Sequence, residues 1–127
     1  MPTVKVLVVD DSVLMRQAIV SLLQGIGCVV VGEGANGAEA LQMAHRLHPD
    51  LVVLDINMPV MGGFEALHLL KKEMPTTEFV FITSKLEPWV REKAVGLGAR
   101  ACLQKDSDLW EELSAVVSQV SPNGRSA

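Results

Sequence analysis

The apolar positions of the chain form short runs that alternate with longer, periodic segments. Five runs are continuously apolar and rich in β-branched residues, which is typical of buried strands: residues 5–9, 28–31, 51–55, 79–84 and 101–104. Because these runs do not alternate between apolar and polar positions, they predict a parallel sheet that helices cover on both faces.

The segments between the runs carry apolar residues at the i, i+3, i+4, i+7 spacing of an amphipathic helix. Ser12 is placed to cap the first helix, and Asp106, Ser107 or Asp108 is placed to cap the fifth. Pro88 falls in the first turn of the fourth helix, where proline is tolerated. The apolar faces of the five predicted helices fall within residues 15–23, 40–47, 64–74, 90–97 and 109–120.

Strands that alternate with helices predict an α/β fold with right-handed crossovers. Among doubly wound sheets, the order 2-1-3-4-5 suits five strands and places the first strand beside the third. We therefore expect one doubly wound, five-stranded parallel sheet of the flavodoxin-like (βα)5 type. It would form a single domain over residues 1–120, and residues 121–127 would be a tail or linker.

Composition narrows the function classes. The 127 residues are 49 % hydrophobic, which excludes a disordered chain and suits one domain. Lys and Arg number 11 against 15 Asp and Glu, so the net charge of −4 offers no broad basic surface for nucleic acid. The chain enters a strand pattern directly after Met1, and no apolar run approaches the roughly 18 residues of a membrane span. We expect a cytoplasmic protein without membrane contact.

The cysteines and histidines do not indicate a metal cluster. Cys28 and Cys102 fall on the predicted second and fifth strands, at opposite edges of the sheet, which excludes a disulfide between them. Both thiols are expected to be reduced. His45, His48 and His68 lie on predicted helices without a complete ligand set, so we interpret them as exposed surface residues.

Polar residues follow the predicted strands at the points where the strands end. Asp10 and Asp11 follow the first strand, and Asp55 ends the third. Thr83 lies at the end of the fourth strand, and Lys105 follows the fifth. Because the carboxyl ends of parallel strands meet at one edge of a sheet, these side chains are expected to converge there.

This group of residues has a specific chemistry. Three converging carboxylates repel one another unless a divalent cation lies among them. A site of carboxylate, carbonyl and water oxygens suits Mg²⁺ better than Zn²⁺, since no His or Cys is nearby. The hydroxyl of Thr83 and the ammonium of Lys105 would offset the charge of a phosphoryl group on Asp55, because a carboxylate can act as the nucleophile in phosphoryl transfer.

The sequence resembles the receiver domain of bacterial two-component response regulators over about residues 4–120. The likeness rests on Asp10-Asp11, on Asp55 with Met58-Pro59 and Gly62-Gly63 behind it, on Thr83-Ser84 and on Lys105. Residues 98–106 also resemble receivers of the NarL type, which precede a helix-turn-helix output domain. By resemblance, Asp55 is the phosphoacceptor, and Asp10, Asp11, Asp55 and the backbone carbonyl of Asn57 hold Mg²⁺.

The resemblance further implies that Thr83 and Lys105 contact the phosphoryl oxygens. The donor would be the phosphohistidine of a sensor histidine kinase or of a phosphotransfer protein. The domain would then change conformation on the face of its fourth helix, fifth strand and fifth helix. That face would control an output domain or protein, or form a phosphorylation-dependent homodimer. The chain would catalyse only its own phosphorylation and dephosphorylation, so it would not be an enzyme with a separate substrate.

The sequence departs from the family pattern at the switch. Where the family has an aromatic residue three positions before the lysine, this chain has Cys102, and it contains no Tyr. Asp106 replaces the proline that commonly follows the lysine, which fits the NarL type. A small thiol offers little contact area as a lever, so we expect the coupling to run through Thr83 and the loop 84–88.

Three alternatives use similar architecture. A flavodoxin-like FMN carrier needs a phosphate-cradling loop after the first strand, where Asp10 and Asp11 would repel a phosphate. A phosphatase of the haloacid dehalogenase type needs a second acid two residues after its nucleophile, and Asn57 occupies that position. A structural network of ion pairs is the third alternative, and a metal titration would separate it from the others.

Overall fold

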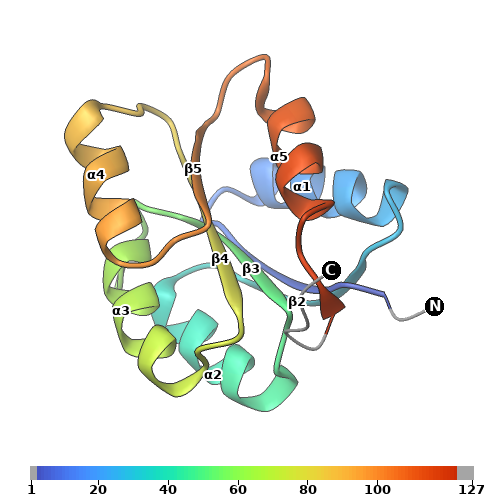
Figure 1. Cartoon of the computed structure of the whole chain (residues 1–127), viewed down its shortest axis with the longest axis horizontal. Helices are drawn as coiled ribbons and strands as arrows, with labels where there is room; N and C mark the ends of the chain where they lie inside the picture. The colour runs from blue at the N-terminus through green and yellow to red at the C-terminus, as the bar shows by residue number, and fades with distance from the viewer. Residues whose placement is uncertain (1–2, 123–127) are drawn as a thin grey trace.

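The computed structural model describes residues 3–122, which form a parallel sheet between two layers of helices (Figure 1). The strand order is β2-β1-β3-β4-β5, and each neighbouring pair is parallel. The predicted doubly wound α/β sheet and its strand order are therefore confirmed. The strands are β1 (Lys5–Val9), β2 (Val29–Gly34), β3 (Leu51–Asp55), β4 (Glu78–Thr83) and β5 (Ala101–Gln104).

A helix follows each strand, and local signals explain where most of the helices begin. The Ser12 hydroxyl accepts a hydrogen bond from the Met15 N–H at 3.3 Å, which confirms Ser12 as the cap of α1. Pro88 opens α4 as predicted. Asp108 is the N-cap of α5, but its side chain makes no capping hydrogen bond. The helices are α1 (Val13–Gly25), α2 (Gly37–Leu47), α3 (Gly63–Glu73), α4 (Pro88–Gly96) and α5 (Leu109–Val117).

The two faces of the sheet bury separate apolar clusters. Helices α1 and α5 cover one face, and α2, α3 and α4 cover the other (Figure 1). Successive residues of β1 point to opposite faces, so Val6 and Val8 join one cluster while Leu7 and Val9 join the other. All four side chains are fully buried. This explains why the central strands are continuously apolar, and it fixes their carboxyl ends in a rigid frame.

Strand β2 differs most from the prediction. It begins at Val29 and continues to Gly34, whereas the pattern predicted residues 28–31. The predicted strand ends at residue 31, before the glycines, but Gly32 and Gly34 pair with Leu7 and Val9 of β1. A Cβ atom at Gly32 would press on the Leu47 side chain of α2, so glycine here serves close packing. The bounds of the other strands shift by at most one residue, with β4 at residues 78–83, whereas α5 ends at Val117 and so stops short of position 120.

The cysteines and histidines lie as predicted. Cys28 and Cys102 are free thiols, next to and within the two edge strands. His45, His48 and His68 are exposed. Of the predicted tail at residues 121–127, positions 123–127 lie outside the described residues. Within residues 3–122, no helix combines the length and the apolar character that crossing a membrane requires.

Val60 lies in the loop between β3 and α3 with a φ of 68°, in the left-handed region. Its side chain is 84 % exposed, so burial does not offset the strain that a β-branched residue has in this conformation. We expect Val60→Asn to raise the free energy of unfolding by about 1 kcal/mol, because Asn tolerates the left-handed region. Chemical denaturation measures this change. Val95→Asn, at an exposed position in α4, is the control and should bring no gain. An unchanged or lower stability of Val60→Asn would show that Val60 is not strained.

Candidate functional site

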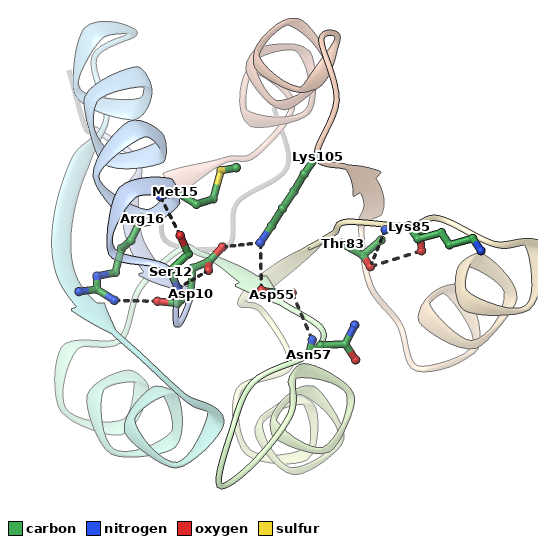
Figure 2. A network of polar contacts seen from close by, with 9 residues as sticks. All are labelled: Asp10, Ser12, Met15, Arg16, Asp55, Asn57, Thr83, Lys85 and Lys105. Carbon is green, nitrogen blue, oxygen red and sulfur yellow. Dashed lines mark hydrogen bonds and ion pairs between the residues drawn. The ribbon is translucent and has the colours of Figure 1, made fainter.

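Three strands present charged side chains at the carboxyl edge of the sheet (Figure 2). Asp10 follows β1, Asp55 ends β3 and Lys105 follows β5. The Lys105 Nζ lies 3.1 Å from Asp10 Oδ2 and 3.0 Å from Asp55 Oδ2. One ammonium group therefore bridges carboxylates from the two adjacent central strands, and Lys105 reaches them from the edge strand.

Asp10 is fully buried, and hydrogen bonds of its backbone N–H and of its carboxylate fix its position. Its N–H donates to the Gly34 carbonyl of β2 at 3.0 Å, and its Oδ1 accepts from the Ser12 N–H at 2.9 Å. Its Oδ2 is enclosed and accepts no hydrogen bond within residues 3–122, although it forms the ion pair with Lys105. This oxygen is a buried acceptor with unused capacity, which is a property of a ligand atom.

Asp55 is nearly as buried, with 5 % of its surface exposed. Its Oδ1 accepts from the Asn57 N–H at 3.1 Å, while Oδ2 receives Lys105. Burial raises the pKa of Asp55, and the charge of Asp10 raises it further, although Lys105 and the Asn57 N–H act in the opposite direction. The carboxylate therefore has a higher pKa than an ordinary Asp.

The pKa of Lys105 is raised as well. Burial lowers the pKa of its ammonium group, but the contacts with Asp55 and Asp10 outweigh burial and raise the pKa above its usual value. The ammonium group therefore stays charged at neutral pH. It is positioned to offset negative charge that gathers on or beside Asp55.

A close approach of two backbones positions the end of β3. The Gly63 N–H donates to the Ile56 carbonyl at 2.8 Å, and α3 begins at Gly63. A Cβ atom at this position would collide with the Asp55 carbonyl. Only glycine lets α3 start directly against the last residue of β3, which explains why glycine ends the loop that follows Asp55.

Asp11 completes an acidic cluster with the two buried carboxylates. One carboxylate oxygen from each of Asp10, Asp11 and Asp55 lies within 4.8 Å of the others. Asp11 is exposed, so the cluster opens to solvent on its side. The donors are hard carboxylate oxygens, which fits a small hexacoordinate cation with several waters, such as Mg²⁺, and the enclosed Oδ2 of Asp10 has acceptor capacity to spare. The residues present therefore fit the predicted metal.

Thr83 reaches the same edge but not the cluster. It is 2 % exposed at the end of β4, and its carbonyl accepts from the Lys105 N–H at 2.8 Å. Its hydroxyl lies 3.4 Å from both the N and O atoms of Lys85 (Figure 2). Within the described part of the chain no hydrogen bond joins it to Asp55. The predicted residues Asp10, Asp11, Asp55 and Lys105 thus converge, whereas the Thr83 hydroxyl makes its contacts elsewhere.

Sequence reasoning missed Arg16, on the first turns of α1. Its Nη1 donates to the Asp10 carbonyl at 2.7 Å, and its Nε pairs with Glu33 of β2 at 3.2 Å. The only signal in the sequence was a cation one turn into the helix that follows two aspartates. Its partner on β2, Glu33, lies beyond residue 31, where the predicted strand ends.

The chain belongs to the family of response regulator receiver domains, whose family model matches residues 6–117. The chain is thus a receiver domain of the two-component response regulators, and it functions as a phospho-accepting switch.

Individual relatives show the same kinship. The chain is 39 % identical to a protein-glutamate methylesterase/protein-glutamine glutaminase of Archaeoglobus fulgidus, over 91 % of the chain and 34 % of that protein. It is 37 % identical to the response regulator protein VraR of Staphylococcus aureus, over 90 % of the chain and 55 % of VraR. The chain thus spans from a third to about half the length of these relatives.

A solved structure is also similar. The signal receiver domain of the response regulator NarL from Mycobacterium tuberculosis has a TM-score of 0.83 and 32 % identity, over 93 % of this chain and 98 % of that one. Because a methylesterase and NarL are both among the similar proteins, the more specific assignment to the NarL type stays a prediction.

Proposed function

We propose that Asp55 is the phosphoacceptor of this receiver domain, and that Asp10, Asp11, Asp55 and the backbone carbonyl of Asn57 hold Mg²⁺. The observation that carries the proposal is the convergence of two further carboxylates and one ammonium group on the end of β3. A buried carboxylate with a raised pKa beside a permanent cation is typical of a functional site.

The proposed reaction uses the groups of this chain as follows. An Asp55 oxygen attacks the phosphorus atom of a phosphohistidine, so that a P–O bond forms while the P–N bond breaks and its electron pair leaves with the imidazole nitrogen. The Lys105 ammonium offsets negative charge on the transferred oxygens. The Asn57 N–H holds Asp55 in place through Oδ1. When bound, Mg²⁺ supplies charge neutralisation between the carboxylates and the phosphoryl oxygens.

The proposed switch begins at Thr83. Its hydroxyl would leave Lys85 and turn toward the phosphoryl group, and the loop 84–88 would carry this change to α4. The Leu86 N–H donates to Gln104 Oε1 at 2.9 Å, which links this loop to β5. Cys102 lies on β5, where the family has an aromatic lever.

The partners follow from this proposal. The donor is a sensor histidine kinase or phosphotransfer protein in the cytoplasm. The output domain or protein binds the face formed by α4, β5 and α5, where Trp89 is 57 % exposed. Alternatively, a second copy of the chain binds this face after phosphorylation. The chain itself would catalyse only its own phosphorylation and dephosphorylation.

Incubation with a small acyl phosphate tests the proposal. With Mg²⁺ present, intact-protein mass spectrometry should find one phosphoryl group per chain, and hydroxylamine should remove it because an acyl phosphate is labile. Borohydride reduction followed by peptide mapping should place the modification on Asp55. Labelling that resists hydroxylamine, or that maps to another residue, would refute the assignment.

A further inference from the structure

Arg16 connects three elements, α1, β2 and the residue after β1, and Figure 2 shows its contact with Asp10. It belongs to α1, its Nη1 donates to the Asp10 carbonyl at 2.7 Å, and its Nε pairs with Glu33 of β2 at 3.2 Å. The Arg16 side chain is only 18 % exposed. A planar guanidinium group can hold two acceptors at fixed angles, so it fixes the Asp10 peptide relative to β2.

The Asp10 carbonyl needs such a partner. Asp10 comes directly after Val9, the last residue of β1, and its N–H still pairs with the Gly34 carbonyl of β2. A buried carbonyl that accepts no hydrogen bond is costly, and Arg16 donates a short, charge-assisted hydrogen bond to it.

The contacts of Asp10 leave one oxygen for a ligand. Its N–H, its carbonyl and its Oδ1 are bound by Gly34, Arg16 and Ser12, respectively. Only Oδ2 remains without a hydrogen bond within residues 3–122, and it forms the ion pair with Lys105 on the carboxylate that Asp10 contributes to the acidic cluster. The orientation of this oxygen therefore depends on the peptide that Arg16 holds. Within residues 3–122 Arg16 forms its hydrogen bond with the Asp10 carbonyl and its ion pair with Glu33, and it forms no ion pair with a carboxylate of the cluster.

We propose that Arg16 is a positioning residue for Mg²⁺: with Glu33 it locks the Asp10 peptide so that Asp10 Oδ2 and the following Asp11 are preorganised as metal ligands. This inference rests on the proposed function, because it assumes that the cluster holds Mg²⁺. Supporting residues behind metal ligands typically change metal affinity by about 10- to 100-fold. Arg16 acts through Asp10 and touches neither the metal nor the phosphoryl group.

Calorimetric titration with Mg²⁺ alone tests the inference directly. Arg16→Met should weaken Mg²⁺ binding by about 10-fold or more relative to the wild-type chain. Arg16→Lys keeps the charge but cannot hold both acceptors, so its Mg²⁺ affinity should lie between those of Arg16→Met and the wild type. Arg100→Met is the matched control, because Arg100 also pairs with a glutamate, Glu78, and it donates to Gln119, but it lies just before the first residue of β5. It should bind Mg²⁺ as tightly as the wild type.

Phosphorylation by an acyl phosphate gives an independent measurement. Arg16→Met should need about 10-fold more Mg²⁺ for half of the maximal rate, while the rate at saturating Mg²⁺ stays close to that of the wild type. If Arg16 had a merely structural role, Arg16→Met would lower thermal stability, but it would not raise the Mg²⁺ requirement while leaving the rate at saturating Mg²⁺ unchanged. If Arg16→Met does not fold, Arg16→Lys and Glu33→Gln carry the comparison, each with weaker Mg²⁺ binding than the wild type.

The outcomes separate the inference from the proposed function. If the wild type binds Mg²⁺ and Arg16→Met binds it equally tightly, the inference is overturned and the proposed function stands. A saturating rate that falls while half-saturation is unchanged would overturn it as well. If the wild type itself fails to bind Mg²⁺, the proposed function is wrong and the inference falls with it.

Discussion

Asp55→Asn is expected to abolish phosphorylation, lowering the rate of labelling by at least about 1,000-fold, as the loss of a covalent nucleophile does. An amide oxygen is a poor nucleophile, and neither of the two neighbouring carboxylates occupies the end of the central strand. Time courses with an acyl phosphate and Mg²⁺, followed by intact-protein mass spectrometry, measure the effect.

The same variant should remain folded and should be more stable than the wild type at neutral pH. The pKa of Asp55 is raised in the folded state, so ionisation of this group costs stability as the pH rises through its usual pKa toward the raised one. Asn removes that cost and leaves Lys105 paired with Asp10. Higher stability together with lost labelling would show that the activity was not lost through unfolding.

Asp108→Asn is the matched control. Asp108 is an exposed member of a second acidic group, with Asp106 and Glu112, at the start of α5. Its labelling and stability should match those of the wild type. Equal labelling of Asp55→Asn and the wild type would remove Asp55 as the acceptor, and a loss of labelling in Asp108→Asn would direct attention to the second acidic group.

Much of the fold could be predicted because the signals were local or periodic. Continuous apolar runs identify strands that are buried on both faces, and the order of such strands is restricted by the handedness of their crossovers. Strand β2 was the exception, since its pairing with β1 and its packing against Leu47 of α2 decide the role of Gly32 and Gly34. Such tertiary contacts leave no periodic trace in the sequence.

The site also contains features that the sequence predicts and features that it does not. The meeting of Asp10, Asp55 and Lys105 follows from topology alone, because parallel strands end at a common edge. The direction of the Thr83 hydroxyl and the contacts of Arg16 depend on rotamers and on loop geometry. Even where the partner is near in the sequence, as Lys85 is to Thr83, no residue pattern specifies these rotamers, and the structure was needed to find the contacts.

Lys105→Met is expected to lower the free energy of unfolding by about 3 kcal/mol in metal-free buffer at neutral pH, because it leaves two buried carboxylates without their cation. Mg²⁺ should restore part of the loss, since a divalent cation among Asp10, Asp11 and Asp55 relieves the same repulsion. Chemical denaturation with chelator and with Mg²⁺ measures both effects. Lys85→Met is the control, because Lys85 is 81 % exposed and its distant ion pair should contribute less than about 1 kcal/mol.

The pH dependence of this variant distinguishes electrostatic repulsion from lost packing. In the wild type, Lys105 has a raised pKa, so its contribution is complete at neutral pH and is lost only as the pH rises through that raised value. Without Lys105, burial and Asp10 keep the pKa of Asp55 raised, so acidification neutralises Asp55 and relieves the repulsion. The stability difference between the wild type and Lys105→Met should therefore narrow from neutral to mildly acidic pH. A difference that is constant with pH and insensitive to Mg²⁺ would mean that Lys105 stabilises the fold through its hydrocarbon chain, and that the two carboxylates do not form a shared cation site.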